Sequence, residues 1–88
     1  MVKPDKKIDI AFNEAVKKAR NTPIKLPPDT MLLLYAYYKQ ATIGDCNTEC
    51  PGMFQFQKKT MWNEWNNLRG ISKNDAAKMY IYYAEQYV

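Results

Sequence analysis

The fold of this 88-residue chain turns on one stretch near its middle, Met31-Leu32-Leu33-Leu34-Tyr35-Ala36-Tyr37-Tyr38. As a helix it would be apolar or aromatic around its whole circumference, and such a helix has to be covered on all sides. Pro28 and Asp29 suit a first turn and Gly44 suits a C-terminal stop, which predicts a helix from Pro28 to about Ile43. The rest of the chain is too short to enclose that helix completely, so we expect part of it to need another cover, such as a ligand, a second subunit or a membrane.

Helical patterns continue on both sides of this stretch. An apolar stripe with helical spacing precedes it, made by Ile8, Phe12, Ala15, Val16 and Ala19. A third helix is expected from about Phe54 to Arg69, ended by Gly70, and a fourth from a capping-box-like start at Ser72 and Asp75 to the C-terminus. No sustained period-2 alternation indicates a strand. The sequence therefore predicts an all-α fold, a small four-helix bundle that forms one domain over residues 1–88.

The composition argues against catalysis and against a metal site. The chain has no His, which excludes His-based triads, His general bases and His–zinc sites. Ser72 is the only serine and has no evident base partner, so we expect no enzyme activity. Cys46 and Cys50 lack further ligands for a tetrahedral site and are interpreted as free thiols, with no metal and no cofactor.

The charge indicates a binding protein with a small anionic ligand. The formal net charge is +4, but the cations are scattered and nine acids are interleaved with them, which is a weak footprint for nucleic acid. No apolar run is long enough for a transmembrane helix. The segment Met1–Asp9 lacks the apolar stretch of a signal peptide, so the cytoplasm is the expected compartment.

One face of the central helix combines apolar and polar groups. It carries Met31, Tyr35, Tyr38, Lys39 and Thr42. Two phenols beside an ammonium group can bind a phosphate, and the apolar part of the same face can receive a hydrocarbon or a flat ring. The alternative is that the two tyrosines only edge the core while Lys39 extends into solvent. In the third helix we expect Trp65 in the core, whereas the place of Trp62 is left open.

Several motifs together resemble the acyl-CoA-binding protein family. The run from Tyr35 to Asp45 resembles the family signature Y-x-x-Y-K-Q-A-T-x-G-D. Further matches follow in the family's order, at Pro51-Gly52, Trp62-Asn63-Glu64-Trp65, Arg69-Gly70-Ile71-Ser72 and the spacing from Ala76 to Tyr80. The resemblance extends from about Phe12 to Tyr83 and implies an up-down-down-up bundle.

The family's function would make this chain a reversible, high-affinity carrier of medium- to long-chain fatty acyl-CoA. By resemblance, the groups that meet the CoA phosphates and adenine are Tyr35, Tyr38, Lys39, Tyr80 and Arg20, and the acyl groove is lined by Met31, Leu32 and Met61. A monomer is expected, with transient contacts to acyl-CoA-consuming enzymes or membranes and none to nucleic acid. The alternative function is a helical module that binds a protein or a membrane.

The sequence departs from the family pattern in the third helix. The family commonly has a Lys directly before the first Trp, where this chain has Met61, and in many members another Lys four residues earlier, where this chain has Gln57. Lys58 lies three residues before Met61, on the same helical face. We therefore expect Lys58 to substitute in part for these two lysines in binding phosphate.

Overall fold

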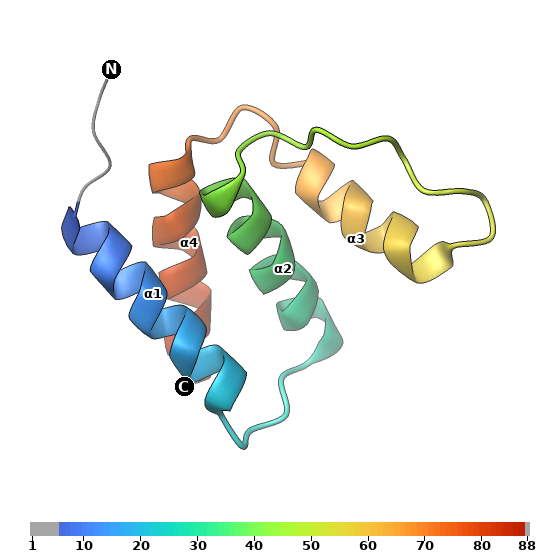
Figure 1. Cartoon of the computed structure of the whole chain (residues 1–88). Coiled ribbons are helices and arrows are strands. Elements are labelled where there is room, and N and C mark those ends of the chain that lie inside the picture. The colour runs from blue at the N-terminus through green and yellow to red at the C-terminus, as the bar shows by residue number, and fades with distance from the viewer. Residues whose placement is uncertain (1–5, 88) are drawn as a thin grey trace.

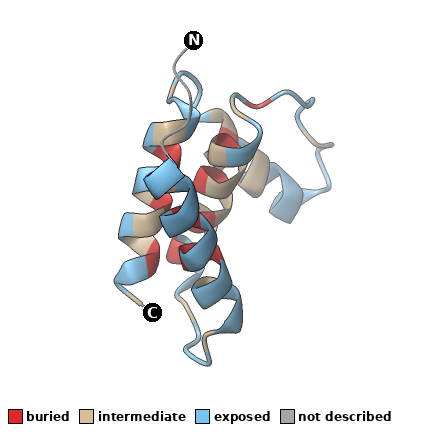
Figure 2. Ribbon diagram, turned by 60° about the vertical axis from the view of Figure 1, so that its left-hand side comes forward, coloured by how far each residue is buried: buried red, intermediate tan, exposed pale blue. Residues whose placement is uncertain are grey.

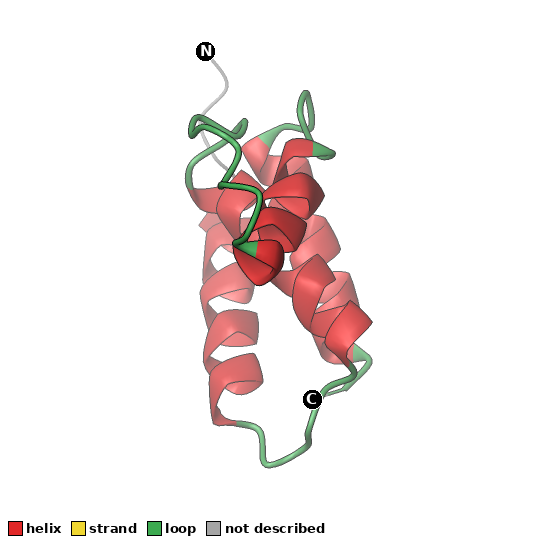
Figure 3. Cartoon of the chain, turned by 90° about the vertical axis from the view of Figure 1, so that its right-hand side faces the viewer, coloured by secondary structure: helices red, strands yellow, loops and turns green. Residues whose placement is uncertain are grey.

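Residues 6–87, the part of the chain that the computed structural model describes, contain four helices joined by loops (Figure 1). They are α1 (Lys6–Asn21), α2 (Pro28–Thr42), α3 (Phe56–Asn66) and α4 (Lys73–Glu85). No strand occurs among these residues, so the expected all-α fold is confirmed (Figure 3). α1 and α4 run in one direction and α2 and α3 in the other, which is the up-down-down-up order (Figure 1). The predicted domain over 1–88 includes residues outside the described range, 1–5 and 88, and stays a prediction.

The helices lie beside one another in the order α1, α4, α2, α3. α4 packs against α1 and α2, whereas α3 packs against α2. The Cα atoms extend over 40 × 38 × 14 Å, so the bundle is flat. No helix within residues 6–87 is long and apolar enough to cross a membrane. Most residues of α2 are nevertheless buried or half-buried, and its exposed residues are Pro28, Asp29, Met31 and Thr42.

The core lies where α1, α2 and α4 face one another (Figure 2). Phe12 of α1 packs edge-on against Tyr80 of α4 at 5.1 Å between ring centroids, and stacks on Tyr38 of α2 at 6.0 Å. The small residues Ala76 and Ala84 let α4 approach its neighbours closely, since both are almost fully buried. Aromatic rings and alanines thus close this small core.

The helix ends follow the glycines, but α3 is shorter than expected. Gly44 and Gly70 adopt φ of +100° and +95°, a left-handed conformation that favours glycine at a helix C-terminal stop. The expected helix from Phe54 to Arg69 was wrong at both ends, since α3 covers Phe56–Asn66. At its start the N–H of Gln55 donates to Gly52 O in a turn, and Phe54 buries too little surface to extend the helix. Beyond Asn66 the chain continues in tighter i→i+3 turns up to Ile71. α2 ends at Thr42, one residue before the predicted Ile43.

The start of α4 is capped as predicted, and a buried amide fixes the end of α2 nearby. The Oγ of Ser72 accepts a hydrogen bond from the N–H of Asp75 at 3.1 Å. Gln40 of α2 is fully buried, and its Nε2 donates to Ile71 O at 2.7 Å and to Asp45 Oδ1 at 2.9 Å. These bonds join the C-terminal end of α2 to the loop before α4.

The carboxylate of Asp45 accepts hydrogen bonds from two segments of the chain. Its Oδ1 also accepts the N–H of Gly70 at 2.8 Å. The bond from Gly70, followed by that from Gln40, lowers the pKa of the Asp45 carboxyl below its usual value, because both stabilise the charged form. The carboxylate therefore helps to hold the loop after α2 against the turn after α3.

Two tryptophans attach α3 to the segment that follows α2. The indole N–H of Trp65 donates to Gly44 O at 2.9 Å, and that of Trp62 donates to Thr48 O at 3.0 Å. Trp65 is buried, which confirms its expected place in the core, whereas Trp62 is half-buried. α3 is therefore held at a defined distance from α2, and the gap between them forms the candidate site.

Candidate functional site

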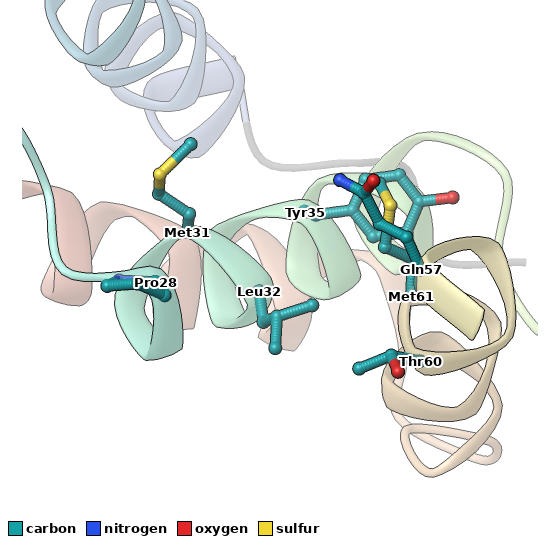
Figure 4. A pocket seen from close by; sticks show the side chains of 7 residues that line it. All are labelled: Pro28, Met31, Leu32, Tyr35, Gln57, Thr60 and Met61. Atoms are coloured by element: carbon teal, nitrogen blue, oxygen red, sulfur yellow. The ribbon is translucent and has the colours of Figure 1, made fainter.

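An apolar groove of about 500 Å³ separates α2 from the first half of α3 (Figure 4). Its walls are Pro28, Met31, Leu32 and Tyr35 from α2, and Gln57, Thr60 and Met61 from α3. The Thr60 hydroxyl donates to Phe56 O at 3.0 Å, which leaves its methyl group toward the groove (Figure 4). The volume falls within the range of ligand pockets, roughly 300–1,000 Å³. This groove can receive a hydrocarbon.

A second cavity, of about 240 Å³, lies on the other side of α2, toward α1 and α4. Arg20 lies at its edge with its guanidinium 5.5 Å from the centroid of the Tyr38 ring. Tyr80 is buried at its base, and burial raises the pKa of this phenol, with Tyr38 adding to the effect and Arg20 opposing it. Tyr80 is therefore protonated at neutral pH. The cavity offers one cation and phenol groups in an otherwise apolar setting, whose further lining residues are Val16, Ala19, Leu26, Met31, Leu34 and Tyr35.

A third cavity, of about 330 Å³, lies near the C-terminal end of α2 and carries two lysines. The ammonium of Lys39 is 5.5 Å from the Trp65 ring and 5.9 Å from the Tyr35 ring, measured to the centroids. These cation–π contacts hold the charge in place. Lys58 of α3 lines the same cavity, together with Tyr35, Thr48, Glu49, Pro51, Met61, Trp62 and Trp65. The arrangement suits a multiply charged anion.

Tyr35 lines all three cavities and links them. Every site residue expected from the sequence lines at least one of them. Met31, Leu32 and Met61 lie in the apolar groove, Arg20, Tyr38 and Tyr80 in the second cavity, and Lys39 and Lys58 in the third. The single face expected on α2 is thus divided, with Tyr38 toward α1 and Lys39 toward α3. Thr42 lines none of these cavities, and its hydroxyl donates to Tyr38 O at 2.7 Å.

Comparison with known proteins shows to which family this chain belongs. The sequence model of the family described as acyl CoA binding protein matches residues 9–84. The chain belongs to the acyl-CoA-binding protein family. The resemblance seen in the run from Tyr35 to Asp45 is therefore confirmed over most of the chain. The family is named for binding rather than for a reaction.

Proteins from three organisms resemble this chain in sequence or in structure. An acyl-CoA-binding protein of Saccharomyces cerevisiae is 43% identical over 77 residues, which cover 88% of each chain. The crystal structure of acyl-CoA-binding protein 2 from Oryza sativa superposes with a TM-score of 0.85 at 35% identity, covering 91% of this chain and 89% of that one. The solution structure of the Babesia bovis acyl-CoA-binding protein gives a TM-score of 0.80 at 43% identity and covers 91% of each chain.

The sequence left several lining residues of this family member unassigned. Thr60 and Gln57 line the groove beside Met61, and the spacing of Gln57 to Thr60 (i, i+3) and to Met61 (i, i+4) on a helix could have indicated a shared side. Glu49 lines the cavity of the two lysines, although it lies in a turn-rich loop with no periodic signal. Its place depends on the path of the loop after α2, which local sequence does not specify. Trp62, whose place the sequence left open, also lines this cavity.

The acidic and cysteine side chains of this family member were also compared with the arrangement that a metal ion requires. Among residues 6–87, no three acidic or cysteine side chains gather where a metal ion could be held. Cys46 is buried and Cys50 is exposed, and both are free thiols, as expected. Cys46 lies close to Thr48, with its Sγ 3.8 Å from the Thr48 hydroxyl oxygen.

Proposed function

We propose that this protein binds medium- to long-chain fatty acyl-CoA esters reversibly and carries them without making or breaking a bond. The observation that carries the proposal is the position of Tyr35, where an apolar groove meets two cavities edged by cations. A ligand that fills all three needs a hydrocarbon tail joined to a compact polyanion. Fatty acyl-CoA has this chemistry, and the relatives are named for binding acyl-CoA.

The acyl chain is assigned to the groove between α2 and α3. Leu32, Met31 and Met61 supply apolar walls, and the flexible methionines can adapt to chains of different length. Each CH₂ group removed from water contributes about 0.8 kcal/mol. Affinity should therefore rise with chain length until the groove is filled.

The CoA head group is assigned to the cations and phenols on both sides of Tyr35. Lys39 is held over the Trp65 ring, so little side-chain freedom is lost when it meets a phosphate. Arg20 lies against Tyr38, where it can pair with a second phosphate or stack on the adenine. The protonated phenol of Tyr80 can donate a hydrogen bond to the same group. Charge-assisted bonds of this kind are about twice as strong as neutral ones.

Lys58 is proposed to substitute in part for the two family lysines that this chain replaces by Gln57 and Met61. It lines the same cavity as Lys39 and Met61, which is the position such a substitution requires. Gln57, by contrast, lines the apolar groove. A single flexible ammonium on α3 would then take over part of the phosphate binding that two lysines provide in many family members.

The absence of catalysis is part of the proposal. The sequence has no His, and the Oγ of its only serine, Ser72, accepts the N–H that caps α4. An activated nucleophile would need a neighbouring base. A cytoplasmic location, a monomeric state and transient contact with acyl-CoA-consuming enzymes or membranes are further predictions. The alternative function, a helical interaction module without a small ligand, is not favoured by the family match.

Isothermal titration calorimetry with acyl-CoA esters of increasing chain length tests the function directly. We expect one ligand per chain, an affinity that rises with acyl length to a plateau, and far weaker binding of free CoA. The groove and the cation-edged cavities each contribute, so a free fatty acid should also bind more weakly than its CoA ester. Equal affinity for free CoA and a long-chain ester would contradict the proposal, because the groove would then contribute nothing.

A further inference from the structure

Large apolar side chains are exposed on the segment that leads into α3. Met53, Phe54 and Phe56 are 73%, 86% and 72% exposed. None of them lines the groove or the two cavities that adjoin it. The segment extends away from α1 and α4, at the outer edge of the flat bundle (Figure 1). With Lys59, which is also exposed, these residues are called the tip patch.

Within the sequence segment that carries the tip patch, all charges are positive. From Cys50 to Asn63 the chain has no acidic residue, and it has two lysines in sequence, Lys58 and Lys59. Phe56 and Lys59 are three residues apart on α3 and share a face. Lys58 belongs to another side of the helix and lines the cavity near Lys39. A cation thus accompanies the exposed aromatic ring, while its neighbour faces the candidate site.

We propose that the tip patch docks on an anionic phospholipid surface, where the protein loads or releases its ligand; this proposal rests on the proposed function. Aromatic and methionine side chains can enter the region between head groups and acyl chains, while a lysine meets the negative surface. The apolar residues of the patch lie close together in the sequence, on a projecting segment rather than in a groove that could hold a peptide. A soft lipid surface fits that shape better than a folded protein.

Docking at this point would place the groove beside the lipid. The helix that carries Phe56 and Lys59 also supplies Gln57, Thr60 and Met61 to the groove. An acyl chain leaving the bilayer would therefore need to travel only a short path through water before it is covered again. The tip patch would affect the rate of transfer between membrane and protein, and leave the equilibrium affinity in solution unchanged.

Vesicle flotation with ligand-free protein tests the proposal. The vesicles are phosphatidylcholine alone, or phosphatidylcholine mixed with phosphatidylserine. We expect wild type to bind the mixed vesicles, and the double variant Phe54→Ser, Phe56→Ser to bind them at least about tenfold more weakly. Lys59→Gln should weaken binding about fivefold and reduce the preference for phosphatidylserine. The matched controls are Ile10→Ser, an exposed apolar residue of α1, and Lys78→Gln, an exposed cation of α4, and both should bind as wild type does.

The same variants are then titrated with acyl-CoA in the absence of vesicles. Unchanged calorimetric affinity in the tip-patch variants, together with loss of vesicle binding, supports docking. If wild type does not bind mixed vesicles, or if the double variant floats with them as wild type does, docking is refuted and the patch would suit a protein partner instead. Failure of wild type to bind acyl-CoA in vesicle-free solution would refute the proposed function, and it is recognised separately because no lipid surface is present.

Discussion

Replacing Lys58 by Gln should weaken acyl-CoA binding, whereas replacing its neighbour Lys59 should not. Lys58 lines the cavity that contains Lys39, and Lys59 lines none of the three cavities described above. The two residues are adjacent, have the same charge and are both exposed. Lys59→Gln therefore controls for the loss of one positive charge from the chain. The difference in acyl-CoA affinity between the two variants then reports the effect of where that charge lies.

The expected size of the effect follows from the exposure of Lys58. Two unit charges about 4 Å apart attract by about 1 kcal/mol in bulk water and by about 4 kcal/mol at an effective dielectric constant near 20. Because Lys58 is exposed, we expect a value near the lower limit, about 1 to 1.5 kcal/mol, or roughly a five- to tenfold loss of affinity. The loss should shrink as salt is raised from about 0.1 M to about 1 M, since the screening length falls from about 10 Å to about 3 Å.

Calorimetry with one long-chain acyl-CoA, at low and high salt, measures this difference. Met61→Lys provides the reverse test, because it restores a family lysine beside the same cavity and should strengthen binding in the Lys58→Gln background. If Lys58→Gln binds as tightly as Lys59→Gln at low salt, Lys58 does not compensate for the missing lysines. If Met61→Lys strengthens acyl-CoA binding although Lys58→Gln alone has not weakened it, the reasoning is contradicted as well.

Two further predictions concern the candidate site and the loop that supports it. Tyr35→Phe should cost about 0.5 to 1.5 kcal/mol of acyl-CoA binding and Lys39→Ala about 1.5 to 3 kcal/mol; equal binding of palmitoyl-CoA by wild type and Lys39→Ala in calorimetry would exclude Lys39 from the site. Asp45 has a lowered pKa in the folded state, so its stabilising effect is present above the unfolded value of about 3.9 and is lost as the pH falls toward the folded value. Urea unfolding should therefore show that Asp45→Asn is less stable than wild type at neutral pH, and the difference in the free energy of unfolding should become smaller in acid. A difference that does not depend on pH would contradict this role.

Local sequence was a good guide to the helices and to the residues near the site. The left-handed Gly44 follows the end of α2 as expected, and Ser72 capped α4. It was a poor guide to the extent of α3. Phe54 has the hydrophobicity of a core residue, yet it is 86% exposed, because no other element covers that end of the segment. Hydrophobic character indicates that a side chain favours burial, and only packing decides whether a partner is present.

For the candidate site, too, the sequence indicated some features and only the structure showed the others. The run from Tyr35 to Asp45 identified the family and the phenol and ammonium groups on α2. It did not indicate that Tyr38 faces Arg20 while Lys39 lies over Trp65, because both partners are distant in the sequence. It also did not place Glu49 in the lysine cavity, since a loop without periodicity takes its path from the elements it connects.

The amino-acid sequence by itself determined that the chain is helical, where α1 and α2 end and where α4 begins, and which residue types are available for a ligand; it did not give the end of α4, which stops at Glu85 and not at the C-terminus. These properties depend on helical spacing, glycine conformation and side-chain chemistry, all of which are local. Tertiary structure alone decided that α3 contacts only α2 and that the bundle is flat. The groove exists because the consecutive helices α2 and α3 lie on either side of a gap, and the width of that gap is fixed by contacts across the loop between them, such as those of Trp62 and Trp65.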